Sequence, residues 1–104
     1  MSLISPFLMD TCEITSFLRQ GSGGPLYGEP EKRNCRMEPA PNTKIVYKNP
    51  SGSIVETAAS QLMFCEGTPV PVHSIVTWQG KRMRVIRCSE MAVFRPHHLE
   101  VYLE

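Results

Sequence analysis

The sequence predicts an all-β fold: a small antiparallel β-barrel of six to seven strands in a single domain over residues 1–104. Short runs of β-branched and aromatic residues alternate with turn signals rich in Gly, Pro and Asn. No stretch carries the sustained 3.6-residue periodicity of a long amphipathic helix. A chain of 104 residues, 41% of them hydrophobic, is also large enough to bury one core.

The best-defined element is a hairpin over residues 72–88. Gly80 separates its two apolar runs, and glycine readily adopts the positive φ that two-residue hairpin turns require. A turn at Gly80 and Lys81 places the apolar side chains on one face. The facing core pairs on this register are Trp78 with Met83 and Val76 with Val85. We expect Trp78 to fill the barrel interior or seal one end; a surface binding role is the alternative.

The N-terminal third is predicted to contain one strand and one long loop. Residues 1–10 form an N-terminal arm or a single helical turn, and the first strand follows at 11–18. The side chains expected on its inner face are Cys12, Ile14 and Leu18. Residues 19–31 contain four glycines and two prolines and are expected to be a flexible loop. This loop opens no helix and lacks Lys-Ser/Thr, so it is not a phosphate-binding loop.

A projecting hairpin is predicted over residues 39–53, between a strand over 32–38 and a strand over 53–65. Its turn signal is Asn49-Pro-Ser-Gly52. Two lysines lie along one side of this hairpin, Lys44 and Lys48. They are candidate contacts for DNA or for an acidic partner, and the alternative is a solvated strand face.

The C-terminal stretch alternates cleanly and predicts the strand that closes the barrel. Its inward side chains are Leu99, Val101 and Leu103. Connectors are expected at 66–71 and 89–96. A helical turn at 58–62 is the alternative to a continuous strand through that segment.

The residues indicate neither an enzyme nor a cofactor. Neighbours on a strand point to opposite faces, so His97 and His98 cannot easily bind one metal. No nucleophile or metalloprotease motif is present. The net charge of +1 gives no support to nucleic-acid binding by itself, although a local basic patch remains compatible with it. No apolar run approaches the ~20 residues of a membrane span.

The cysteines are expected to be reduced, buried thiols rather than disulfides or metal ligands. They are Cys12, Cys35, Cys65 and Cys88, and none forms a C-x-x-C pair. Each lies in a strand-like run, where a thiol packs as a small hydrophobic group. The sequence shows no secretory signal, so an oxidising compartment is not expected.

The order of these parts resembles the head-closure, or stopper, family of small head-tail connector proteins of long-tailed bacteriophages. The resemblance covers about residues 9–103 and rests on segments spread along the chain. They are Asp10-Thr-Cys12, Tyr27-Gly-Glu-Pro30, Cys35-Arg-Met-Glu38, the hairpin from Ile75 to Val85, and the ending His98-Leu-Glu-Val-Tyr-Leu103, which is the most telling. The chain departs from the family at Val72-His-Ser74, where Gly-Asp is frequent.

This resemblance implies a virion protein of a phage or prophage that forms a dodecameric ring at the head-tail junction. The ring closes the DNA exit channel and joins head to tail, and the free chain is a monomer. Implied partners are sister subunits, portal and adaptor proteins, a tail-joining protein and nearby packaged DNA. Lys44 and Lys48 would face the channel. Candidate subunit contacts are Arg82, Arg84, Arg87 and Tyr27, and the alternative for these arginines is a solvated strand edge.

Two other classes of function stay open. One is a small barrel that binds nucleic acid or a protein. Binding of single-stranded nucleic acid would need several exposed aromatic side chains beside basic ones, and Trp78 and Tyr47 are the candidates. A metal-dependent or redox module would use the cysteines instead.

Overall fold

The structure is a computed structural model that describes residues 8–91 and 98–104, without the side chains of residues 41, 42 and 91. Its strands are β1 (Asp10–Thr15), β2 (Phe17–Gly21), β3 (Gly24–Tyr27), β4 (Glu31–Lys48), β5 (Ile54–Cys65), β6 (Ile75–Trp78), β7 (Lys81–Met91) and β8 (His98–Leu103). Most of the predicted N-terminal arm, most of the predicted loop over 89–96, and His97 lie outside the described residues.

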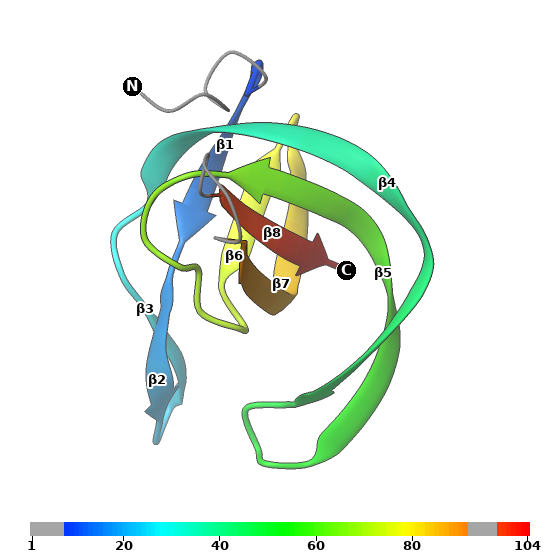
Figure 1. Ribbon diagram of the computed structural model, residues 1–104. Helices are drawn as coiled ribbons and strands as arrows, with labels where there is room; N and C mark the ends of the chain where they lie inside the picture. The colour runs from blue at the N-terminus through cyan, green and yellow to red at the C-terminus, as the bar shows by residue number, and fades with distance from the viewer. Residues whose placement is uncertain (1–7, 92–97) are drawn as a thin grey trace.

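Six strands close into an antiparallel barrel in the order β1-β4-β5-β8-β7-β6, while β2 and β3 form a separate two-stranded sheet (Figure 1). The prediction of an all-β antiparallel fold is confirmed. The C-terminal strand β8 lies between β5 and β7 and pairs with both. In the described part of the chain, no helix is long and apolar enough to cross a membrane.

The barrel interior is filled by side chains that strand alternation points inward. The predicted core residues Val76, Met83, Val85, Leu99, Val101 and Leu103 are each 2% exposed or less. Trp78 is half-buried and packs against this cluster. The core therefore lies where β6, β7 and β8 face β1, β4 and β5.

The turn of the β6–β7 hairpin lies one residue earlier than predicted. Trp78 pairs with Lys81, so Gln79 and Gly80 form the turn, with φ of 51° and 76°. Two successive positive φ angles are typical of the type I′ turn, whose twist suits a hairpin. The predicted pairs, Trp78 with Met83 and Val76 with Val85, were both wrong by two positions, because Met83 pairs with Val76 instead. A shift of two residues leaves each side chain on its predicted face, because strand side chains alternate with period 2.

The loop expected over 19–31 contains most of a second hairpin, so that prediction was wrong in part. β2 and β3 pair with Gly21 opposite Gly24. The glycines fall at the turn, where Gly24 has a φ of 126°, and there they favour a hairpin. Leu18, expected on the inner face of the first strand, lies on this hairpin and is 63% exposed.

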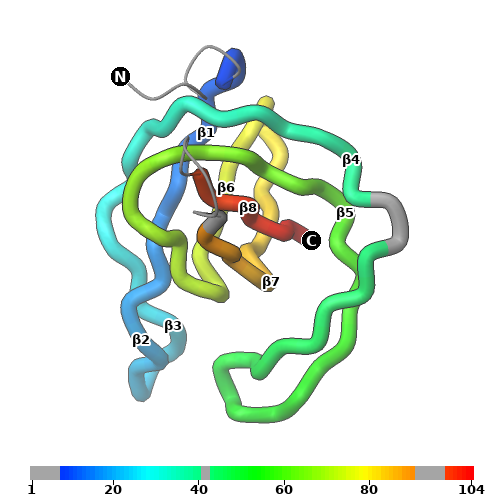
Figure 2. Tube along the Cα trace, viewed as in Figure 1, coloured from blue at the N-terminus to red at the C-terminus, as the bar shows by residue number. Residues whose placement is uncertain are grey.

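β4 continues through the proline-containing segment that was predicted to end it. The register against β5 shifts between Pro39 and Thr43, so that three residues of β4 stand opposite Ser60 alone. Such a bulge accommodates proline and bends the strand. β5 is continuous and has no helical turn at 58–62. Figure 2 shows that the β4–β5 hairpin runs on beyond the barrel strands to a distant turn.

We call residues 43–59, the outer part of the β4–β5 hairpin, the arm. Within it Thr43–Lys48 pairs with Ile54–Ala59. The arm contains most of the projecting hairpin predicted over 39–53.

A register shift in β7 creates a second, smaller core between the arm and the barrel. The pairing of β7 with β8 skips Ile86, between Val85 and Arg87. Val85 belongs to the barrel core and Ile86 to the second cluster, and both are 1% exposed or less. The second cluster comprises Ala40, Ile45, Tyr47, Ala59 and Ile86. The inner face of the arm is thus packed against the outside of the barrel wall.

Candidate functional site: an arm anchored to the barrel

The tip of the arm is a tight turn organised by Asn49. The Gly52 N–H donates to the Asn49 carbonyl at 2.9 Å, and the Asn49 N–H donates to the Ser53 carbonyl at 2.9 Å. The Asn49 Oδ1 also accepts from the Ser53 N–H and the Ser51 hydroxyl, at 2.9 and 2.8 Å. Gly52 has a φ of 94°, which glycine adopts without strain. The turn predicted from Asn-Pro-Ser-Gly is therefore present and well bonded.

A polar network fastens the arm to the barrel through Glu104. The Tyr47 hydroxyl donates to Glu104 Oε1 at 3.2 Å, and Arg84 Nε donates to the same oxygen at 2.9 Å. Arg84 Nη2 also donates to Glu104 Oε1 and, at 3.0 Å, to the Tyr47 hydroxyl oxygen. The Arg84 guanidinium lies 5.7 Å from the centre of the Tyr47 ring. One carboxylate and one guanidinium therefore join the arm to β7 and to the end of β8.

The pKa values in this network reflect mutual stabilisation of charges. Burial opposes ionisation of Glu104, but hydrogen bonds from Arg84, Thr57 and Tyr47 outweigh it and lower the pKa of the carboxyl group. The hydrogen bond to Glu104 raises the pKa of Arg84. Burial and the nearby Glu104 charge raise the pKa of Tyr47. Thr57 adds a contact from the second strand of the arm, so both strands are held.

His73 lies where the arm meets the β2–β3 hairpin. Its ring centre is 5.9 Å from that of Tyr47 and 5.2 Å from that of Phe17, the latter edge-to-face. Burial and the Arg84 charge lower the pKa of the imidazole and outweigh the opposing effect of the Lys48 backbone. Its buried Nδ1 has no hydrogen-bond partner among the described residues. His73 has a φ of 80°, which non-glycine residues adopt rarely.

The outer face of the arm combines basic and apolar side chains. Lys44, Val46 and Lys48 alternate with the buried residues of β4 and are exposed. Val46 is 58% exposed, and Ile54, which pairs with Lys48, is 76% exposed. Lys44 Nζ lies 3.8 Å from Glu56 Oε1 across the hairpin, in an exposed ion pair. The two predicted lysines therefore share one exposed face.

The four candidate subunit contacts are not equivalent in the structure. Arg82 and Arg87 are exposed on β7. Tyr27 is 38% exposed and packs edge-to-face on Phe17, at 6.0 Å between ring centres. Arg84 is engaged with Glu104 and Tyr47 inside the chain, an arrangement that sequence reasoning missed.

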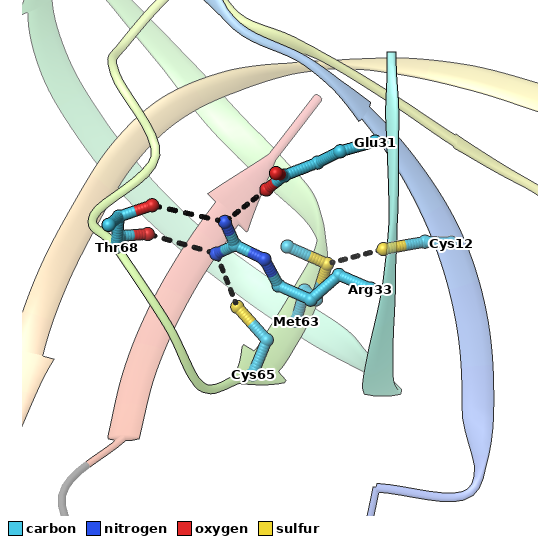
Figure 3. A network of polar contacts seen from close by, with 6 residues as sticks. All are labelled: Cys12, Glu31, Arg33, Met63, Cys65 and Thr68. Carbon is cyan, nitrogen blue, oxygen red and sulfur yellow. Dashed lines mark hydrogen bonds and ion pairs between the residues drawn. The ribbon is translucent and has the colours of Figure 1, made fainter.

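A second arginine, the half-buried Arg33, braces β4 against the connector after β5 (Figure 3). It bonds to Glu31, to the Thr68 carbonyl at 2.9 Å and to Cys65 Sγ at 3.8 Å. Burial opposes its charge, but the bonds to Glu31 and Cys65 outweigh this effect and raise its pKa. Strand alternation could have predicted this contact. Arg33 lies two residues from the inward-facing Cys35 and therefore on the same face, where a charged side chain requires a partner.

An open, mostly polar cleft of about 490 Å³ lies over this brace. It is lined by Leu8, Glu31, Lys32, Arg33, Asn34, Glu66, Gly67 and Thr68. Of the two carboxylates in this lining, Glu31 is paired with Arg33, which also bonds to Thr68 in the connector after β5. Over residues 8–91 and 98–104 no group of three or more His, Cys, Asp or Glu side chains is arranged to hold a metal ion.

Comparison with known proteins adds no further identification, because the chain matches no protein-family model and no curated protein sequence.

Proposed function

We propose that this chain is a structural protein of the head-tail junction of a phage or prophage virion. It assembles with sister subunits into a ring that closes the DNA exit channel and joins head to tail. The observation that carries the proposal is the arm: a hairpin held to a closed barrel by its inner face, with Lys44 and Lys48 together on the exposed outer face. A channel-lining element needs a fixed base and an exposed face that carries positive charge, and on this face Glu56 offsets the charge of Lys44 only.

In this proposal the arm faces the channel and the two lysines approach packaged DNA. Lysine binds DNA phosphates without recognising bases. Two exposed lysines in each subunit, repeated around the ring, are therefore sufficient to help retain the packaged DNA. The Glu104 network sets the direction in which each subunit presents its arm, because both arm strands are bonded to it. The dodecameric state follows from the family resemblance.

Contacts between subunits are assigned to exposed groups elsewhere on the chain. Arg82, Arg87 and Tyr27 are the side chains proposed for them, with Arg84 acting indirectly by holding the arm. The exposed leucines of the β2–β3 hairpin provide apolar area that a neighbouring subunit, an adaptor or a tail-joining protein can cover. No catalytic role is proposed.

Binding of single-stranded nucleic acid is the weaker alternative. Stacking on bases requires exposed aromatic faces. Tyr47 is 8% exposed and its ring is occupied by Arg84 and His73, and Trp78 packs against the barrel core. A protein-binding module of another kind is favoured by exposed Val46 and Ile54, and the experiment below separates it from a neck protein.

The test is the completion of purified, tail-less, DNA-filled heads of the cognate phage. We expect the wild-type chain to join these heads, reduce DNA leakage and permit tail attachment. The double variant Lys44→Glu/Lys48→Glu should still join the heads but retain DNA less well, because both channel-facing charges are reversed. The control is Lys81→Glu, at the exposed lysine that begins β7.

Heads that remain leaky and tail-less after addition of the wild-type chain would contradict the proposed function. Equal DNA retention by the wild-type chain and the double variant would leave a neck protein but remove the arm from contact with DNA.

A further inference from the structure

The arm has two long edges that carry no neighbouring strand within the residues that the structure describes. β4 pairs with β1 only over Glu31–Cys35, and β5 pairs with β8 only over Gln61–Cys65. Over Thr43–Lys48 and Ile54–Ala59 the two strands therefore pair with each other alone. We call the outer sides of these two segments the free edges. A free edge presents main-chain N–H and C=O groups to any strand that can lie beside it.

The hydrogen bonds of the turn fix which residues turn their main chain outward. The Asn49 N–H donates to the Ser53 carbonyl, so these two residues form a hydrogen-bonded pair of the ladder. Along antiparallel strands, such pairs alternate with pairs whose N–H and C=O groups point away from the partner strand. The residues that point these groups to the free edges are Lys44, Val46 and Lys48 on β4 and Ile54, Glu56 and Ala58 on β5.

The two free edges carry opposite charges. All six outward residues are exposed, and the two largest apolar ones, Val46 and Ile54, are 58% and 76% exposed. The charges on the β4 edge are two lysines, whereas the β5 edge has the single charge of Glu56. Two copies that paired β5 with β5 in the fully bonded register would set Glu56 against Glu56, and like charges directly opposite each other destabilise a sheet. Pairing β4 with β4 sets lysine against lysine in the same way.

One register between unlike edges matches the charges and the apolar side chains together. With Lys44 of one copy opposite Glu56 of another, antiparallel pairing sets Val46 opposite Ile54. Both are hydrogen-bonded pairs, because each of these residues points its N–H and C=O to a free edge. The other register that sets a lysine against Glu56 places Pro50 opposite Ile54, and proline has no N–H to donate. The first register is therefore favoured.

We propose that the free edge of β4 in one copy of this chain pairs with the free edge of β5 in the next, so that the arms form one continuous antiparallel sheet. Because β4 and β5 run in opposite directions, copies in the same orientation meet in this way. The contact joins unlike surfaces, and such contacts generate rings when the rotation between copies closes. Closure into a ring rests on the head-tail function proposed above, whereas the pairing of two arms does not depend on it.

The contact is weak between two copies and gains strength by repetition. It consists of a few main-chain hydrogen bonds, one apolar pair and one exposed ion pair, and exposed ion pairs contribute little. Subunit contacts elsewhere on the chain raise the effective concentration of neighbouring arms for each other. In this register Lys48 stands opposite Gly52, so the charge of Lys48 stays available to the channel.

The test follows the full chain by sedimentation velocity at concentrations that rise to the millimolar range. We expect a monomer at low concentration and reversible association as the concentration rises. Lys44→Glu sets two carboxylates opposite each other and Glu56→Lys sets two amines opposite each other, so each variant should associate roughly tenfold more weakly. A one-to-one mixture of the two variants should recover the wild-type association, because each meets the opposite charge on the other.

The mixture separates pairing between arms from a change within one arm, because the repulsion between residues 44 and 56 of the same chain persists in it. Lys81→Glu makes the same change of charge on β7 and should associate like the wild-type chain. On association, hydrogen exchange should slow at the amides of Ile54 and Glu56.

A chain that stays monomeric at every concentration would overturn the proposal, as would a mixture that associates no better than either variant. Association without protection of the Ile54 and Glu56 amides would also overturn it. Paired arms on a chain that fails to complete DNA-filled heads would retain this contact and contradict only the head-tail function.

Discussion

Two hairpins leave the barrel, and they are attached to it in different ways. The arm buries Ile45 and Tyr47 in a core of its own and bonds to Glu104. The β2–β3 hairpin is attached at its base, where the Phe17 N–H donates to Ser74 Oγ at 2.8 Å and the Phe17 ring meets His73. Its leucines, Leu18 and Leu26, are 63% and 41% exposed.

The difference shows that projection and rigidity are separate properties. An isolated two-stranded sheet is only marginally stable in water, so a hairpin is held as firmly as its contacts with the body allow. The arm has one apolar face that the barrel covers, whereas β2 and β3 expose most of their side chains. We infer that the arm holds its exposed side chains in a fixed position, whereas the β2–β3 hairpin can change its position relative to the barrel.

The largest effect is expected from loss of the apolar anchor of the arm. Ile45→Ala removes a side chain that is 1% exposed in the second core, which should lower the free energy of unfolding by about 3 kcal/mol. The matched control is Val46→Ala, the next residue on the opposite face, with an expected change within about 0.5 kcal/mol. Denaturant unfolding measures both. Similar losses from the two variants would mean that the arm is not docked.

The polar anchor should contribute less, because it is partly exposed. Glu104→Gln removes the charge that Arg84 and Tyr47 share and should cost about 1 kcal/mol after allowance for solvent screening. Hydrogen exchange should quicken over residues 43–59 and stay unchanged in β6 and β8. Glu56→Gln, in the exposed pair with Lys44, is the control and should change neither quantity appreciably. Uniform acceleration throughout the barrel would argue against a local anchor.

Acidification should weaken the arm in two steps. His73 has a pKa lowered from 6.5, so below that pH the unfolded chain binds a proton that the folded chain resists, and stability falls as pH falls. Glu104 has a pKa lowered from 4.5, so its contribution is lost in turn as pH falls through the folded value. Melting temperatures across this range measure the loss.

The first step is assigned by His73→Asn, because asparagine tolerates the positive φ and does not titrate. This variant should flatten the pH dependence just below 6.5. An unchanged slope would remove His73 from the account.

The smallest effect is expected in the β2–β3 hairpin. Leu18→Ser replaces an exposed side chain and should change the free energy of unfolding by less than about 0.5 kcal/mol. Amides of β2 and β3 should exchange faster than those of the arm in the free chain. Slow exchange in β2, or a loss of more than about 1 kcal/mol in the variant, would reverse the contrast between the hairpins.

Much of the barrel was predictable, because strand alternation is a local property. Leu99, Val101 and Leu103 alternate with polar residues, and burial of one face follows from that pattern alone. Even the misplaced turn at Gly80 left the inward residues of β6 and β7 unchanged, since the error was two positions. The prediction of a loop over residues 19–31 was wrong because the glycines were interpreted as ending regular structure, whereas they occupy the turn of a hairpin.

What the sequence by itself determined is therefore the strands of the barrel, most of their inward faces and the tight turn at Asn49. The tertiary structure alone decided the partners of the charged and sulfur-bearing side chains. Arg84 meets Glu104 and Tyr47, and Cys12 meets Met63, because the closed barrel brings together residues that are distant in the sequence. Alternation specifies the face on which a side chain lies, but the residue it contacts depends on strand order and register, which only the assembled sheet defines.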